Sequence, residues 1–140
     1  MEMRERVVVV SGATAGIGKA IARKFVEEGA KVVLLGRSGA AGSRVEAELR
    51  TLAQRQGAGD CAFLKADVSD GAQVRDAIAA VLARWGRIDV LVNNAAIMKT
   101  GALLDMPEEA WDEVMAINLK GPFLLAKYAI PAMPQQAAIV

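Results

Sequence analysis

The chain has 140 residues, which is enough for one domain with a sizeable core and no need of disulfides. Hydrophobic residues make up 54% of it, and 17 basic against 16 acidic side chains leave a net charge of +1. This balance gives no electrostatic basis for binding nucleic acid or an anionic membrane. One cysteine and no histidine exclude an internal disulfide and a histidine base, and they leave no ligand set for zinc, so we expect no metal.

The N-terminal segment "MEMRERVVVV" is charged and then apolar over too few residues for a signal peptide. No other apolar run approaches the length of a membrane span. We therefore expect a soluble, cytoplasmic protein without a membrane segment.

Short segments rich in Val, Ile and Leu alternate with helical patterns along the chain. The first, "RVVVVS" at 6–11, lacks polar alternation, as does a strand buried on both faces of a parallel sheet. The apolar spacing that follows predicts a helix from about Ile17, and Gly29 can end it.

The same alternation continues through the middle of the chain. "KVVLLG" at 31–36 predicts a second strand, and the next helical pattern ends near Gly57. "CAFLKAD" at 61–67 predicts a third strand. Because Cys61 lies in this short apolar run, we expect a buried thiol rather than a nucleophile.

A third helix is predicted between the third and fourth strands. Ser69 or Asp70 can be its N-cap and Gly86 can end it. Trp85, in its last turn, is expected to pack at the core or its edge. "RIDVLVNN" at 87–94 then predicts the fourth strand.

The last third of the sequence predicts two helices and the opening of a fifth strand. Pro107 can begin the first helix, and residues from Leu119 to about Met133 form the second, with glycine and prolines that distort its ends. "QQAAIV" at 135–140 opens the strand, where the chain is cut off. The order of elements predicts one domain over 1–140, a doubly wound α/β parallel sheet with right-handed crossovers.

A glycine-rich loop, "SGATAGIG" at 11–18, joins the first strand to the first helix. In such a sheet the ligand lies at the carboxyl ends of the strands, which is where this loop lies. Gly12 can make the turn, Gly16 can let a diphosphate approach, and Gly18 can let the helix pack closely on the sheet. Thr14 can add a hydroxyl donor. The alternative is a turn that only tightens the junction between strand and helix.

Four motifs together resemble the short-chain dehydrogenase/reductase family over essentially the whole chain. The loop spacing is similar to the family's T-G-x-x-x-G-I-G, with Ser11 in place of Thr. "ADVSD", "IDVLVNNAA" and "MAINLKG" resemble the family's segments at the adenine ring, at the fourth strand and at the catalytic asparagine. The resemblance implies an incomplete Rossmann fold with Asn118 as a catalytic residue. It implies cofactor contacts at Gly12, Thr14, Ala15, Gly16, Ile17, Gly18, Asp67, Val68, Asn94, Ala95 and Ala96.

The end of the second strand bears on the choice of nicotinamide cofactor. Gly36 stands where a carboxylate would bond the ribose hydroxyls of NAD, and Arg37 and Ser38 follow. A guanidinium fits a 2′-phosphate through paired N–H donors, so we predict NADP in preference to NAD. Arg37 could instead be a solvated loop cation. The glycine loop has Ala15 where many NADP-using members carry a basic residue.

The family's chemistry is hydride transfer between nicotinamide and a carbonyl or alcohol carbon, with a serine, a tyrosine, a lysine and an asparagine. Tyr128 is the only tyrosine, and Ala132 stands where the lysine should follow, so we expect Tyr128 to be a packing residue. The family's serine would lie beyond Val140. Of the four, only Asn118 is present, and we expect the chain alone to be inactive.

Two alternatives remain open, a non-catalytic NADP(H)-binding module and a methyltransferase with a similar sheet. The run of reductase-like motifs argues against the second. The helix around 119–133 lacks the elements that would normally cover it, so we expect a homo-oligomer or a piece of a longer protein.

Overall fold

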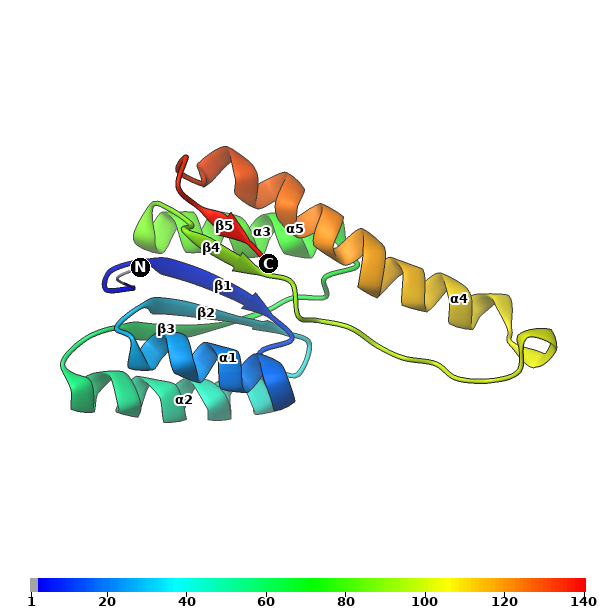
Figure 1. Cartoon of the computed structure of the whole chain (residues 1–140), viewed down its shortest axis with the longest axis horizontal. Coiled ribbons are helices and arrows are strands. Elements are labelled where there is room, and N and C mark those ends of the chain that lie inside the picture. The colour runs from blue at the N-terminus through cyan, green and yellow to red at the C-terminus, as the bar shows by residue number, and fades with distance from the viewer. Residues whose placement is uncertain (1–2) are drawn as a thin grey trace.

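The computed structural model describes residues 3–140 as one parallel sheet between two layers of helices (Figure 1). The sheet has the strand order β3-β2-β1-β4-β5. Its strands are β1 (Val7–Ser11), β2 (Lys31–Gly36), β3 (Asp60–Lys65), β4 (Val90–Val92) and β5 (Ala138–Ile139). The order reverses at β1, which pairs with β2 on one side and with β4 on the other.

Helices cover both faces of the sheet. In Figure 1, α1 (Gly16–Glu27) and α2 (Gly39–Gln56) lie below the sheet, and α3 (Gly71–Trp85) and α5 (Gly121–Ala129) lie above it. The long connection after β4 contains a 3-10 turn, η1 (Leu103–Asp105). It leads into α4 (Glu108–Met115), which projects beyond the sheet (Figure 1).

The run of four valines explains why both faces need a helical layer. Val7 and Val9 pack into the core cluster with α3 and α5, whereas Val8 and Val10 pack into the cluster with α1 and α2. All four are at most 1% exposed. Because alternate residues of a strand face opposite sides, an unbroken apolar run requires a sheet covered on both sides. The predicted doubly wound Rossmann architecture is therefore confirmed.

The strands agree with the predicted ranges except at their ends. The second strand has the predicted bounds, and β5 pairs with β4 as expected for the opening of a fifth strand. The fourth is much shorter than 87–94. The side chains at its ends have partners outside the strand: the carboxylate of Asp89 binds two arginines, and the amide of Asn94 turns toward β1.

The helix ends follow the sequence signals. Asp70 is the N-cap of α3, and its carboxylate accepts hydrogen bonds from the N–H groups of Ala72 and Gln73. Gly57 and Gly86 end α2 and α3 in the left-handed conformation. Gly29 adopts a positive φ of 84° directly after the C-cap of α1.

The two helices predicted after β4 are α4 and α5, but no break separates them. Helical backbone runs from α4 through a π-helical turn, η2 (Ala116–Lys120), into α5, and a 3-10 turn, η3 (Ile130–Ala132), ends it. Pro122 stands at the start of α5. Its missing N–H and its ring are accommodated by the wider turn that precedes it.

Two further findings concern burial and length. Cys61 is fully buried as predicted, and desolvation of the thiolate raises the pKa of its thiol to about 12. Among the helices of residues 3–140, none has the length and apolar composition that crossing a membrane requires.

Candidate functional site

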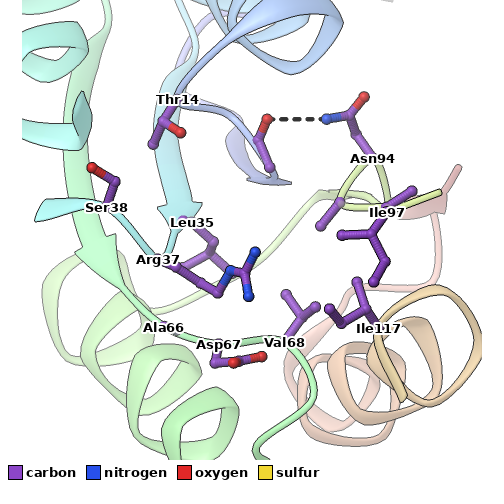
Figure 2. A pocket seen from close by; sticks show the side chains of 14 residues that line it. Thr14, Leu35, Arg37, Ser38, Ala66, Asp67, Val68, Asn94, Ile97 and Ile117 are labelled. Atoms are coloured by element: carbon purple, nitrogen blue, oxygen red, sulfur yellow. Dashed lines mark hydrogen bonds between the residues drawn. The ribbon is translucent and has the colours of Figure 1, made fainter. Parts of the chain in front are cut away.

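A pocket opens where the carboxyl ends of the first four strands meet (Figure 2). Its volume of about 350 Å³ lies at the lower end of the range of about 300–1,000 Å³ for small-molecule sites. It brings together most of the predicted cofactor-binding residues. They are Gly12, Thr14, Arg37, Ser38, Asp67, Val68, Asn94, Ala95 and Ala96, and Leu35, Gly36, Ala66, Ile97 and Ile117 complete the lining.

Ala15, Gly16, Ile17 and Gly18 do not line this pocket but form the adjoining start of α1. Gly16 has a φ of +52°, and a Cβ there would meet nothing within 4 Å. Gly12 has a φ of +64°, and a Cβ there would lie 2.9 Å from the Cα of Ala95. Gly12 is thus required by close packing, whereas Gly16 combines a left-handed backbone with open space.

Gly18 is required by close packing. A Cβ at this position would overlap the carbonyl oxygen of Gly12 and the side-chain amide of Asn94. Gly18 is needed for the close packing of α1 on Gly12, which follows β1, and on Asn94, which follows β4.

Ser11 and Asn94 hold the glycine loop to the segment after β4. The hydroxyl of Ser11 accepts hydrogen bonds from the N–H groups of Asn94 (3.0 Å) and Ala95 (3.1 Å), and it donates to the carbonyl of Val92. The amide of Asn94 donates to the carbonyls of Ser11 (3.0 Å) and Gly12 (3.1 Å). The dashed line in Figure 2 marks a hydrogen bond donated by this amide. The sequence analysis named Ser11 only as the residue in place of Thr in the loop motif, and it did not predict these hydrogen bonds.

The N-terminus of α1 has no side-chain cap and no acidic residue in its first turn. α2 and α3 differ, because Ser38 and Asp70 cap them. Ala15 and Ile17 are exposed beside the open face of Gly16. The free N–H groups and the positive end of the helix dipole therefore suit an anion here.

Two cations flank the loop, and only one of them faces the pocket. The ammonium of Lys19 lies 2.7 Å from a carboxylate oxygen of Glu48 and is held on the surface between α1 and α2. Arg37 is exposed, makes no ion pair within residues 3–140, and extends into the pocket in Figure 2. Ser38 is partly engaged, because its hydroxyl accepts a hydrogen bond from the N–H of Ala41.

Gly36 allows the glycine loop to approach β2. A Cβ at Gly36 would lie 2.7 Å from Cγ2 of Thr14. An acidic side chain could not enter this position unless Thr14 moved. The arrangement therefore leaves Arg37 as the charged residue at this end of β2.

Asp67 and Val68 form the wall of the pocket on the side of β3. Oδ1 of Asp67 accepts hydrogen bonds from the N–H (2.9 Å) and the hydroxyl (2.6 Å) of Ser69. The N–H of Asp67 donates to Oε1 of Gln73 at 2.9 Å. Val68 is 6% exposed and packs in the core cluster of this face.

Asn118 lies in the π-helical turn, beside Ile117 and outside the pocket lining. Its Oδ1 accepts a hydrogen bond from the N–H of Ile97 at 2.9 Å, and its Nδ2 donates to the carbonyl of Ile97 at 2.8 Å. The side chain is thus a clamp on the loop after β4. π-helical turns interrupt the regular hydrogen-bond ladder of a helix and are frequent at functional sites.

Tyr128 packs against the core cluster under α3 and α5 and does not line the pocket, as expected for a packing residue. Trp85 packs against the same cluster, at its partly buried edge.

Comparisons with known proteins identify the family of the chain. A family model of short chain dehydrogenases matches residues 6–140. An uncharacterized oxidoreductase of Thermotoga maritima is 38% identical over 136 residues, which are 97% of this chain and 51% of that protein. The chain spans about half the length of the curated relatives it matches.

Solved structures show the same arrangement. A metagenomic short-chain oxidoreductase in complex with NADP has a TM-score of 0.84 and 38% identity, over 94% of this chain and 58% of that one. The NADH-dependent reductase A1-R′ complexed with NAD has a TM-score of 0.81 and 30% identity, over 93% of this chain and 53% of that one. The family match extends from β1 to the last residue of the sequence, and the chain belongs to the short-chain dehydrogenase family.

Proposed function

We propose that this chain is the cofactor-binding part of an NADP-dependent oxidoreductase that acts on a carbonyl or an alcohol. The observation that carries the proposal is the pocket together with the adjoining, uncapped start of α1, where the face of Gly16 is open. Arg37 lines this pocket and makes no ion pair within residues 3–140. The structures of similar proteins with NADP and with NAD support a nicotinamide cofactor.

Each part of the pocket has a task in this proposal. The first turn of α1, with Ala15, Gly16, Ile17 and the hydroxyl of Thr14, binds the diphosphate. Asp67 and Val68 bind the adenine, and Ala95 and Ala96 border the path toward the nicotinamide. Bound nicotinamide would supply or take up the hydride.

The preference for NADP depends on Arg37. A 2′-phosphate can accept paired hydrogen bonds from its guanidinium, and Gly36 offers no carboxylate to repel that phosphate. Ser38 can add a hydroxyl donor. NAD is the alternative cofactor, because one of the similar proteins was solved with NAD bound. Titration of the chain with both cofactors distinguishes the two.

Asn118 contributes by fixing the loop after β4 through both backbone groups of Ile97, which lines the pocket.

Reduction of a carbonyl also needs an acid that protonates the developing alkoxide, and a positioned acid contributes about 10² to 10⁴ in rate. Tyr128 is partly buried against the core cluster, lies outside the pocket lining and has no lysine four residues later. We therefore propose that these 140 residues bind cofactor but do not turn over substrate alone.

The deciding experiment is a fluorescence titration of the chain with NADPH and with NADH. Tighter binding of NADPH supports the proposal, and binding of neither cofactor rejects it. The same sample is then assayed for NADPH oxidation with a panel of ketones and aldehydes, where no turnover is expected. Turnover by the chain that is unaffected by Tyr128→Phe would reject the proposal that these residues are inactive alone.

A second candidate function is a non-catalytic NADP(H)-binding module, in which the same pocket binds the cofactor without turnover of a substrate. The two candidates differ in a version extended with a family-like C-terminal half. Recovery of carbonyl reduction would support the enzyme.

We also propose that the protein forms a homo-oligomer in the cytoplasm. The continuous helical segment of α4, η2 and α5 exposes three large apolar side chains, Trp111, Leu119 and Phe123, which are 60–65% exposed. A groove there has an apolar centre between Asp112 and Lys120. A second copy packed antiparallel would place each Asp112 near the other Lys120. Sedimentation of the chain and of Phe123→Asp tests this, because the substitution should give monomers.

A further inference from the structure

A glutamine outside the pocket, Gln73, joins the loop that carries Asp67 to the first turn of α3. Its Oε1 accepts the hydrogen bond from the N–H of Asp67 at 2.9 Å. Its Nε2 donates to Oδ2 of Asp70 at 3.0 Å, and its own N–H donates to Oδ1 of Asp70 at 3.1 Å. One side chain therefore connects the loop at 66–70 with the helix that follows it.

The same loop is fixed from its other side. The N–H of Asp70 donates to the carbonyl of Asp67, and the N–H of Ala66 donates to the carbonyl of Gly36 on β2. Ser69 directs both of its donors to Oδ1 of Asp67. The backbone and one carboxylate oxygen of Asp67 are thus held by four hydrogen bonds, and the preceding residue, Ala66, is held by a fifth.

The second oxygen of Asp67, Oδ2, makes no hydrogen bond within residues 3–140. Figure 2 shows this carboxylate at the edge of the pocket on the side of the β3–α3 loop. An ionised carboxylate only accepts hydrogen bonds. Its free oxygen therefore favours a ligand group that donates, such as the 6-amino group of a purine, and opposes a 6-oxo group at the same place.

We infer that Gln73 is a positioning residue for base selectivity: by holding the backbone of Asp67, it directs the free carboxylate oxygen toward the 6-amino group of the cofactor's purine. The inference rests on the proposed function. Gln73 itself is exposed and lies outside the pocket lining, so it acts through Asp67 and not by contact with the ligand.

The test compares binding of NADPH with binding of its 6-oxo analogue, reduced nicotinamide hypoxanthine dinucleotide phosphate, by fluorescence. The unmodified chain should prefer NADPH by about tenfold or more, as expected for a charged hydrogen bond. In Gln73→Met, which keeps the length and helix propensity of the side chain, the preference should fall to about twofold or less. The loss should come from weaker NADPH binding, with the affinity for the analogue nearly unchanged.

A matched exchange checks the mechanism. Asp70→Asn combined with Gln73→Glu swaps the amide and the carboxylate, so that every hydrogen bond of the pair can form at unchanged net charge. This double variant should recover the preference for NADPH. If Gln73→Met does not fold, the double variant still tests whether the hydrogen bonds of this pair position Asp67.

The outcomes separate the two proposals. An equal loss for both ligands in Gln73→Met, or no loss of preference, would overturn the positioning role. Binding of both ligands by the unmodified chain without preference would overturn it as well and leave the cofactor proposal standing. Binding of neither ligand would reject the proposed function itself.

Discussion

The side-chain amide of Asn118 pairs with both backbone groups of Ile97, which lies 21 residues earlier in the sequence. Through these two bonds the π-helical turn holds the loop after β4 against the pocket. Asn118 is exposed, so the clamp is open to solvent on one side.

Replacement of this amide should loosen the loop more than it harms cofactor binding. Asn118→Leu keeps the side-chain size but removes both hydrogen bonds, and each is worth about 0.5–1.5 kcal/mol. We expect the free energy of unfolding in urea to fall by about 1–3 kcal/mol. NADPH affinity should change little, because Asn118 is not among the pocket-lining residues. A loss of NADPH binding with unchanged stability would show instead a direct contact with cofactor.

Gly16→Val should abolish NADPH binding by placing a branched side chain in the open space beside the start of α1. Gly16 has a φ of +52°, so the substitution also strains the backbone. Gly57→Val is the matched control, because Gly57 has a φ of +66° and equally open surroundings but lies at the end of α2. Equal NADPH affinity in both variants, measured by fluorescence titration, would reject the diphosphate site.

Arg37→Ala should weaken NADPH binding by about 10-fold to 100-fold, as expected for a charge-assisted pair, and leave NADH nearly unchanged. The control is Arg44→Ala, which removes another exposed guanidinium, from α2 outside the pocket. A loss of the same size for both cofactors would assign Arg37 a structural role. Tighter binding of NADH by the unmodified chain would reject the preference for NADP.

The sheet was predictable because its signal is local. Four consecutive valines can be buried only between two layers, and glycines with a positive φ end the helices where the sequence places them. The positions of Arg37 and Asp67 in the pocket follow from the rule that ligands bind at the carboxyl ends of parallel strands.

The partners of the site residues could not be predicted, because they depend on contacts between distant segments. Ser11 and Asn94 are 83 residues apart, and only the pairing of β1 with β4 brings them together. The close approach of Gly18 to Gly12 has the same origin. The π-helical turn at Asn118 was missed because proline and glycine signals at 121–122 indicate a helix end equally well.

Asp89 should make the stability of the fold depend on acid pH. This carboxylate is 2% exposed and accepts hydrogen bonds from the N–H of Val7 and from Arg6 and Arg87. Burial acts to raise the pKa of Asp89, but the hydrogen bonds from Val7, Arg87 and Arg6 outweigh it and hold the pKa below its usual value.

A pKa that is lower in the folded than in the unfolded chain stabilises the fold above the unfolded pKa of about 3.9, and this contribution is lost as the pH falls through the folded pKa. We therefore expect the free energy of unfolding to decline below about pH 4. Asp89→Asn should lower it by about 1.5–3 kcal/mol at neutral pH, because the partly exposed Arg6 and Arg87 lose their charged hydrogen-bond partner, and should flatten the acid limb. Asp76→Asn, which removes an exposed carboxylate paired with Arg75, should do neither. Urea titrations from pH 3 to pH 7 measure both effects, and an unchanged acid limb in Asp89→Asn would assign the pH dependence to other carboxylates.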